Sequence, residues 1–324
     1  MDYTNLLTIS MPVYERKEFF RDALESALNQ TVKCKVIVID NCSSHDHFEQ
    51  ICKEKGVTYY RNDRNIGLAP NFARGFELAK TKYVTNLQDD DLLSPDYVEA
   101  FVNAVEKHPD LDIFFTDFVR LTPNGKLPHH HTLPFGYMEN GDKVIEYGIR
   151  YKLGFPYISS AIKRTNVNGF DKYDGGGSYD WAWLYSNANH FSFYGDSRKL
   201  YSFRQHEMQH TQKNAVHYNL STPYIYEAIL KEKTSDPELK KLAAKGAFWE
   251  LVHLKSVADK DVISSFLQKD NIYSHYLKDK LENDLRLKTI FFVPQPGIDF
   301  LYRSMKKIAL LWDPRMNSEG PNIH

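Results

Sequence analysis

Tyr83–Pro95 reads Tyr-Val-Thr-Asn-Leu-Gln-Asp-Asp-Asp-Leu-Leu-Ser-Pro, and this stretch decides the predicted fold. Its apolar, β-branched beginning predicts a buried strand, which leads directly into the three carboxylates of Asp89–Asp91. Ser94 as N-cap and Pro95 at the first helical position predict that a helix follows. Three adjacent like charges repel one another, and hard oxygen ligands suit Mg²⁺ or Mn²⁺. The triplet therefore predicts a metal held against a phosphate, with a solvated acidic turn as the alternative.

Composition narrows the class of protein. The length of 324 residues favours one α/β domain plus an appendage. With 41 basic and 42 acidic residues the net charge is −1, which gives no basic footprint for nucleic acid. Three cysteines without metal-type spacing indicate reduced thiols in the cytosol. The first strand begins within about ten residues of Met1, and no run of about 18 apolar residues occurs, so we expect neither signal peptide nor membrane span.

Strands and helices alternate along the first 121 residues. This alternation predicts a mostly parallel sheet, whose ligands bind beyond the carboxyl ends of the strands. Tyr14, Asp40 and Asp89–Asp91 follow such ends and should converge on one crevice. Pro12 should end the first strand. The predicted strands are Leu6–Ser10, Lys35–Ile39, Val57–Arg61, Tyr83–Leu87 and Ile113–Leu121, and the predicted helices are Lys17–Asn29, Asp46–Lys55 with Ser43 or Ser44 as cap, one from about Asn71 to Lys80, and one from Pro95.

The second half of the chain shows a weaker pattern. Residues 122–147 are rich in Pro, Gly and His, and the adjacent His129–His131 favour a solvated loop over a zinc site. Beyond about Thr222 the pattern becomes helical, and Ser235 with Glu238 predicts a capping box. The further predictions here are strands at 155–162 and 201–206 and a glycine-rich loop, 174–178, ahead of a helix.

Residues 285–312 mix aromatic and aliphatic side chains with arginine and lysine. Such a mixture is typical of a helix that lies on a membrane surface, although a helix packed on its own domain is the favoured reading. The sequence therefore predicts at most peripheral membrane contact through 285–312.

The order of these motifs resembles the family 2 glycosyltransferases, which bind nucleotide-sugars on a GT-A fold. The resemblance covers about residues 5–210 and leaves the helical remainder out. It implies a Rossmann-like α/β domain, 1–215, with a nucleotide-binding half at 1–121 and an acceptor-binding half at 122–215. The helical pattern beyond this domain predicts a helical C-terminal region, 216–324. The matching motifs are Met11–Glu15, Ile39–Ser43, Asn65-x-Gly67, Asn71-x-x-Arg74-Gly75, Leu87–Asp91 with Pro95, and Arg204-x-His206.

The resemblance also implies residue roles. A divalent cation, Mn²⁺ or Mg²⁺, would bridge the diphosphate of the donor, with Asp90 as the principal ligand. Arg74 would pair with phosphate oxygens, and Arg204 and His206 would close over the diphosphate. The implied donor-binding residues are Pro12, Tyr14, Glu15, Asp40, Asn41, Asn65, Arg74, Asp89, Asp90 and Arg204, and the implied metal ligands are Asp90, Asp91 and His206.

Asp180 is the candidate catalytic base. Its position ahead of Trp183-Leu184 resembles the acidic motif of the family, where a carboxylate deprotonates the acceptor hydroxyl and direct displacement inverts the anomeric carbon. Tyr179 stands where an acid often occurs, so Asp174 is kept as a second candidate. The structural alternative is that Asp180 caps a helix.

Several choices stay open at this point. Asn41 and Gln88 stand where the family often has acids, so a UDP-sugar is favoured while GDP- and dTDP-sugars remain open. The expected acceptor is a glycan or lipid-linked sugar in surface polysaccharide or glycan synthesis in the cytoplasm. The competing functions are a sugar nucleotidyltransferase and a non-catalytic nucleotide- or glycan-binding module. A dinucleotide oxidoreductase is disfavoured because no Gly-x-Gly-x-x-Gly follows the first strand. Neither the sugar, the linkage nor the oligomeric state follows from the sequence.

Overall fold

The computed structural model describes residues 3–128, 133–173, 177–207, 215–300 and 302–303. The chain divides into two compact units. The first comprises residues Met1–Gly141, Pro156–Asp171 and His190–His206, and the second comprises Asp142–Phe155, Lys172–Asn189 and Glu207–His324. Helices α5 (Asp142–Arg150) and α6 (Tyr179–Asn187) thus group with the C-terminal helices, whereas the sequence-based division placed its boundary at residue 215.

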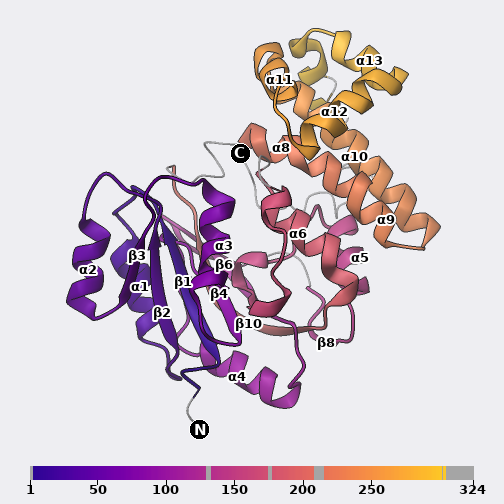
Figure 1. The fold of residues 1–324 in the computed structure, drawn as a ribbon. Coiled ribbons are helices and arrows are strands. Elements are labelled where there is room, and N and C mark those ends of the chain that lie inside the picture. The colour runs from indigo at the N-terminus through magenta and orange to yellow at the C-terminus, as the bar shows by residue number, and fades with distance from the viewer. Residues whose placement is uncertain (1–2, 129–132, 174–176, 208–214, 301, 304–324) are drawn as a thin grey trace. The chain divides into compact units, whose positions relative to one another are not determined.

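One mixed sheet forms the centre of the first unit, in the order β3-β2-β1-β4-β9-β6-β10-β5, with β7 paired to β6 and β8 to β10. Strands β3, β2, β1 and β4 are parallel, as the alternation predicted (Figure 1). Beyond β4 the sheet is mixed, because β9 runs antiparallel to both of its neighbours. The strands are β1 (Leu7–Val13), β2 (Lys35–Asp40), β3 (Thr58–Arg61), β4 (Tyr83–Asn86), β5 (Leu92–Leu93), β6 (Ile113–Thr122), β7 (Gly125–Pro128), β8 (Gly136–Met138), β9 (Ala161–Lys163) and β10 (Phe193–Arg204).

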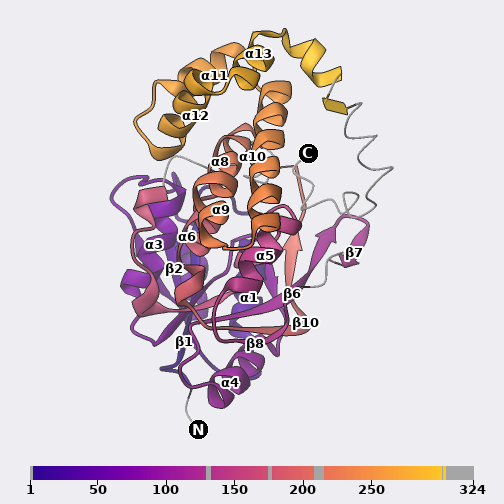
Figure 2. The ribbon, with the colours of Figure 1, turned by 90° about the vertical axis from the view of Figure 1, so that its right-hand side faces the viewer.

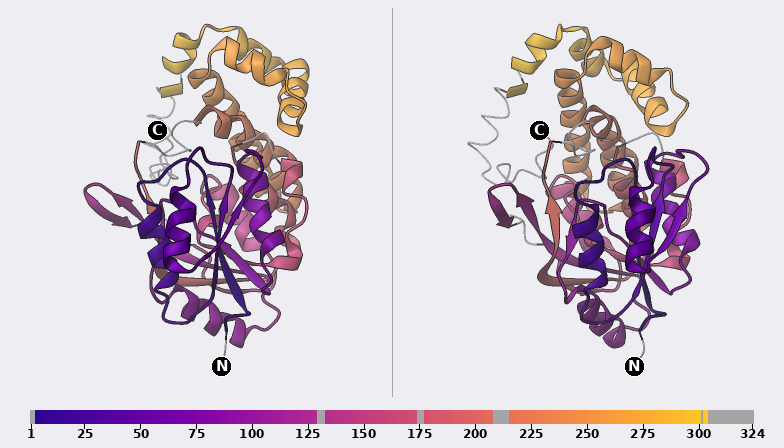
Figure 3. Two further views of the ribbon diagram at one scale, coloured as in Figure 1. Left: turned by 60° about the vertical axis from the view of Figure 1, so that its left-hand side comes forward. Right: turned by 90° about the vertical axis from the view of Figure 1, so that its left-hand side faces the viewer.

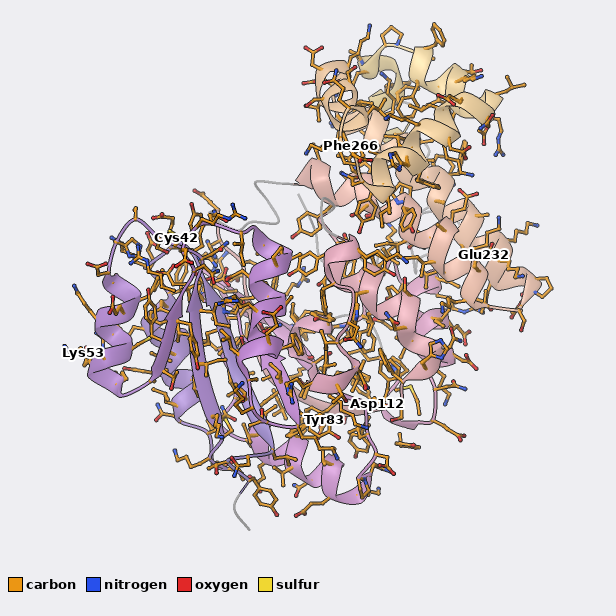
Figure 4. The ribbon with its side chains drawn as sticks, viewed as in Figure 1. Cys42, Lys53, Tyr83, Asp112, Glu232 and Phe266 are labelled. Carbon is orange, nitrogen blue, oxygen red and sulfur yellow. The ribbon has the colours of Figure 1, made fainter. Side chains whose placement is uncertain are left out.

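The helices of the first unit cover the sheet with apolar faces. Phe20, Ala23, Leu24 and Ala27 recur at helical spacing on α1 and are buried in the same core as β1 and β4. The helices are α1 (Phe20–Leu28), α2 (His47–Lys55), α3 (Leu68–Leu78) and α4 (Tyr97–Lys107). Figure 4 places Cys42 beyond the carboxyl end of β2 and Tyr83 at the opposite end of the sheet, where β4 begins. The candidate site lies at the end marked by Cys42.

Strand β1 continues through Pro12, which corrects the prediction that proline would end it. The pairing of β1 with β4 stops at Ser10 and Asn86, whereas its pairing with β2 runs on to Val13 and Asp40. Successive residues of a strand direct their backbone hydrogen-bonding groups alternately to the two neighbouring strands. The backbone of Pro12 is directed toward β4, and the pairing of β1 with β4 has already stopped before this residue. The missing N–H therefore breaks no hydrogen bond.

Several predicted helix caps are displaced. Asp96, rather than Ser94, precedes α4, and Asp46 precedes α2 in place of Ser43 or Ser44. Ser43 instead donates its hydroxyl hydrogen bond to Asp40.

Residues 122–147, where the sequence pattern is weak, include regular structure. They contain β7, β8 and the start of α5, and the β6–β7 hairpin extends away from the rest of the sheet (Figures 2 and 3). The segment 155–162, predicted as one strand, contains a 3₁₀ turn, Tyr157–Ser159, and only the first two residues of β9 (Ala161–Lys163). His129–His131 and Asp174 lie outside the described residues.

The second unit is helical, as predicted for the C-terminal region. Its core is formed by apolar side chains of α8 and α10–α13, among them Leu254, Phe266 and Tyr273. None of the helices in the described part of the chain is long and apolar enough to cross a membrane. The helical segments are α5 (Asp142–Arg150), α6 (Tyr179–Asn187), α8 (Ala215–Tyr224), a π-helical stretch (Ile225–Leu230), α9 (Lys231–Lys233), α10 (Pro237–Val257), α11 (Lys260–Leu267), α12 (Ile272–Asn283) and α13 (Leu285–Phe292).

Candidate functional site

The acidic triplet is buried in the loop after β4. Asp89, Asp90 and Asp91 are 7%, 3% and 0% exposed, so a solvated acidic turn is the wrong interpretation. Asp91 joins this loop to β10, because its two carboxylate oxygens accept hydrogen bonds from the Tyr201 hydroxyl at 2.6 Å and from the Arg204 backbone N–H at 2.8 Å. Burial, reinforced by the charge of Asp90, raises the pKa of Asp91 well above its ordinary value.

Arg16 supplies a counter-charge that the sequence analysis missed. Its guanidinium group forms an ion pair with Asp89 and another with Asp90, the latter at 2.8 Å. Burial raises the pKa of Asp89 to about 7, and the charge of Arg16 offsets part of that effect. Arg16 follows the first strand closely, and the three carboxylates follow β4. This pairing of a cation with an acidic triplet is the sequence signal that would have identified Arg16.

Arg204 and His206 meet Asp90, in agreement with the proximity that the family resemblance implied. His206 Nε2 lies 2.9 Å from Asp90 Oδ2, and Arg204 Nε donates a 2.7 Å hydrogen bond to the Asp90 carbonyl. Phe19 packs beside both, with its ring centroid 4.7 Å from that of His206 and 4.6 Å from Arg204 Cζ. The loop after β4, the start of α1 and the end of β10 thus form one cluster.

Asp90 has an unused ligand atom. Its Oδ1 is buried and accepts no hydrogen bond in the described structure. No group of three or more His, Cys, Asp or Glu side chains is arranged as a metal site among the described residues. The donor set of carboxylate oxygens and an imidazole nevertheless fits a divalent cation, since these are ligand types that Mg²⁺ and Mn²⁺ accept.

A second cluster of predicted donor-binding residues lies after β1 and β2. Asp40 is fully buried, and its carboxylate accepts hydrogen bonds from the Ser43 N–H at 2.9 Å, the Ser43 hydroxyl at 2.6 Å and the Tyr59 hydroxyl at 2.6 Å. Asn41 donates to Asn65 Oδ1 at 2.8 Å. These contacts hold the loops that follow β2 and β3.

The turn after β1 is fixed to the same loops. Glu15 has φ 58°, in the left-handed region, and its N–H donates to Ser43 Oγ at 2.9 Å. The Glu15 carboxylate accepts from both the N–H and the hydroxyl of Ser44 at 2.8 Å. Backbone strain of this kind persists only where surrounding contacts hold it in place, as these do.

The other predicted donor-binding residues, Tyr14, Pro12 and Arg74, have less direct links to the acidic cluster. Tyr14 is 45% exposed beyond the end of β1, and Pro12 is buried within that strand. Arg74 lies on α3, where its guanidinium is 3.6 Å from Glu77. Direct contact between Arg74 and the acidic cluster is therefore not seen in this structure.

Asp180 lies in the second unit, in the first turn of α6. The residue at the N-cap position is Ser178, and the Asp180 carboxylate accepts a hydrogen bond from a first-turn N–H, that of Trp181. Burial raises the pKa of Asp180 to about 6, while the Trp181 N–H, 2.9 Å from Oδ1, offsets part of that effect. A carboxylate with this pKa is ionised at neutral pH yet basic enough to accept a proton.

Known proteins match this chain over its first half in sequence and over most of its length in fold. The family model described as glycosyl transferase family 2 matches residues 8–161. An uncharacterized glycosyltransferase of Methanocaldococcus jannaschii is 28% identical over 130 residues, which cover 38% of this chain and 44% of the relative. The matched curated relatives are thus spanned over less than half of their length.

Two solved structures show the same fold at low sequence identity. Staphylococcus aureus TarS 1–349, in complex with UDP-GlcNAc, superimposes with a TM-score of 0.63 and 12% identity over 93% of this chain and 92% of that one. The mannosyltransferase PcManGT of Pyrobaculum calidifontis, in complex with GDP-Man and Mn²⁺, gives a TM-score of 0.51 and 11% identity over 93% of this chain and 86% of that one. The GT-A fold expected from the sequence is confirmed, and residues 8–161 match the model of glycosyl transferase family 2, the family that the sequence motifs resemble.

Proposed function

We propose that this protein transfers a sugar from a nucleoside diphosphate sugar to a hydroxyl group of a glycan or lipid-linked acceptor, with inversion at the anomeric carbon. The observation that carries the proposal is the buried carboxylate cluster after β4, in which Asp90 keeps one oxygen free. A buried carboxylate oxygen without a partner is costly unless a ligand completes the site.

Asp90 and His206 are the residues that would hold a divalent cation in this proposal. Such a cation, when bound, neutralises negative charge on the departing diphosphate. Asp91 uses both carboxylate oxygens for Tyr201 and Arg204, so we assign it to orienting the loop rather than to direct ligation. Arg204, hydrogen-bonded to the Asp90 carbonyl, would fix the backbone of that loop.

Asp180 is the proposed general base. Its carboxylate would take the proton of the acceptor hydroxyl, and attack from the side opposite the leaving diphosphate gives inversion. The support is its raised pKa and its position at the start of α6.

A UDP-sugar is the favoured donor. The TarS complex contains UDP-GlcNAc and the PcManGT complex contains GDP-Man, which supports the nucleoside diphosphate class without choosing the base. Asn41 donates to Asn65 and to the Gly67 carbonyl and accepts from the Ile66 N–H, so its amide is engaged within the protein. Base selection by Asn41 would require these contacts to be exchanged.

Thermal denaturation with UDP, GDP, dTDP or CMP, each in Mn²⁺ or EDTA, tests this proposal. A ligand at about 100 times its Kd should stabilise the folded protein by about 2.7 kcal/mol. We expect one nucleoside diphosphate to stabilise the wild type only with metal, and Asp90→Ala to abolish the effect. Asp110→Ala, at an exposed aspartate outside the cluster, is the matched control. If no nucleotide shifts the transition, the protein is better described as a glycan-binding module.

A further inference from the structure

The guanidinium group of Arg16 lies beside the side chains that are proposed to bind the divalent cation. It contacts Asp89 and Asp90, and its Nη1 lies 3.5 Å from His206 Nε2. The two groups proposed to hold the divalent cation, Asp90 and His206, therefore both face Arg16. Its side chain is only 18% exposed, so the contact is largely removed from solvent.

The backbone that carries Arg16 is fixed independently of this contact. Its N–H donates to the Tyr14 carbonyl at 2.7 Å, and the adjacent Glu15 is held by Ser43 and Ser44. Release of the guanidinium therefore requires movement of the Arg16 side chain and not of the turn.

We propose that Arg16 is a built-in counter-ion that competes with the divalent cation for Asp90 until the donor diphosphate draws the Arg16 side chain away. This inference rests on the proposed function, because it requires a metal and a diphosphate at this site. A guanidinium and a divalent cation beside the same carboxylates repel each other, so the nucleotide-free protein should bind the cation weakly.

The diphosphate would relieve this competition. Its oxygens offer the planar guanidinium the same bidentate, charge-assisted hydrogen bonds that carboxylates offer. Metal and nucleotide should consequently bind cooperatively, and the coupling must be equal in both directions. In the metal-free protein the positive charge of Arg16 would also offset part of the negative charge of Asp89 and Asp90, which favours the folded state.

Calorimetric titration with Mn²⁺, in the presence and absence of UDP, measures this coupling. Arg16→Gln should bind Mn²⁺ about tenfold more tightly than the wild type without UDP, within the range typical of coupled sites. The increase in Mn²⁺ affinity caused by UDP should shrink in the same variant. Arg21→Gln is the matched control, because Arg21 lies on α1 in an exposed ion pair with Glu54 and should behave as the wild type.

Thermal denaturation separates the inference from folding defects. Arg16→Gln leaves buried carboxylates without their counter-charge, so its melting temperature should fall in EDTA and should rise more than that of the wild type on adding Mn²⁺. If Arg16→Gln does not fold, Arg16→Lys replaces it in the titration. Its Mn²⁺ affinity without UDP should be higher than that of the wild type.

The outcomes distinguish this inference from the proposed function. Unchanged or weaker Mn²⁺ binding by the Arg16 variants, with UDP and Mn²⁺ still binding together, would overturn the inference and leave the proposed function intact. If neither wild type nor variant bound Mn²⁺ with or without UDP, both would fall.

Discussion

Asp180 is the single residue on which the proposed chemistry depends most. We predict that Asp180→Asn lowers the transfer rate by about 10²- to 10⁴-fold, the usual contribution of a positioned general base. Donor binding should be unchanged, because the nucleotide is proposed to bind in the first unit. The measurement is sugar transfer at saturating donor, with nucleotide-induced thermal stabilisation of the same variant as control. A variant that kept the wild-type rate would assign the proton transfer elsewhere.

The pKa of Asp180 also predicts a pH dependence. Because burial raises this pKa to about 6, the carboxylate is protonated below pH 6 and ionised above it. Transfer at limiting acceptor should therefore rise with pH through about 6 and level off near neutral pH. A profile of kcat/KM against pH, recorded in parallel with nucleotide binding, detects this rise in the transfer rate. A flat profile between pH 5 and 7 would contradict the assignment.

Candidate site residues could be picked out from the sequence where a motif lies within one short stretch. Asp90 and His206 each belong to such a stretch, and the structure places them in contact. Arg16 was missed because its partner Asp89 lies 73 positions away along the chain. The like-charge repulsion in the triplet showed that a positive group was needed, but only the parallel sheet order shows which side chain supplies it.

At the level of single elements, the long helix α10 shows which residue caps its N-terminus. The Asp236 carboxylate accepts hydrogen bonds from the N–H groups of Glu238 and Leu239, whereas the sequence pattern favoured Ser235 as the cap. We predict that Asp236→Ala lowers the free energy of unfolding by about 1 kcal/mol, the typical value of an N-cap.

Ser235→Ala is the matched control for this helix end. Ser235 is exposed and directly precedes the N-cap, whose side chain makes the capping hydrogen bonds, so Ser235→Ala should change the free energy of unfolding by less than about 0.5 kcal/mol. Urea unfolding followed by circular dichroism measures both variants. A larger loss from Ser235→Ala than from Asp236→Ala would restore the cap predicted from the sequence.

Element prediction succeeded where each strand is followed by an amphipathic helix. Strands β1–β4 and helices α1–α3 lie close to their predicted ranges, because buried parallel strands and amphipathic helices have strong apolar patterns. The short antiparallel strands β8 and β9 have three residues each, too few for a periodic pattern. Their place is decided by pairing with distant strands, which local sequence does not encode.

At the scale of the whole molecule, the division into two units depends on chain segments that are discontinuous in sequence. The second unit takes up 142–155 and 172–189 in addition to everything from 207 onward. The division expected from the family resemblance treated residues 1–215 as one continuous domain, so it placed α5 and α6 with the sheet. Contacts such as that of α5 with α10 decide the grouping.

The net charge of the whole molecule does not favour contact with a membrane. With a net charge of −1, the protein has no general attraction to an anionic bilayer, so any binding must come from a local surface. Leu285, Phe292 and Phe300 are 75%, 91% and 72% exposed in the second unit, and Arg286 and Lys288 lie beside them along the chain. Exposed apolar side chains next to cations are typical of proteins that lie on membrane surfaces.

We therefore predict that the full chain sediments with vesicles containing phosphatidylglycerol and less with phosphatidylcholine alone. Phe292→Ser should weaken this binding by about 10- to 150-fold, because burial of an aromatic side chain contributes about 1.5–3 kcal/mol. Leu127→Ser is the matched control, since Leu127 is a 47% exposed apolar residue on β7 and should have no effect. Equal losses from both variants would indicate non-specific adsorption. If the protein stayed in the supernatant with every vesicle, these side chains would have to contact protein instead, and an acceptor embedded in a bilayer would have to reach the site without help from this surface.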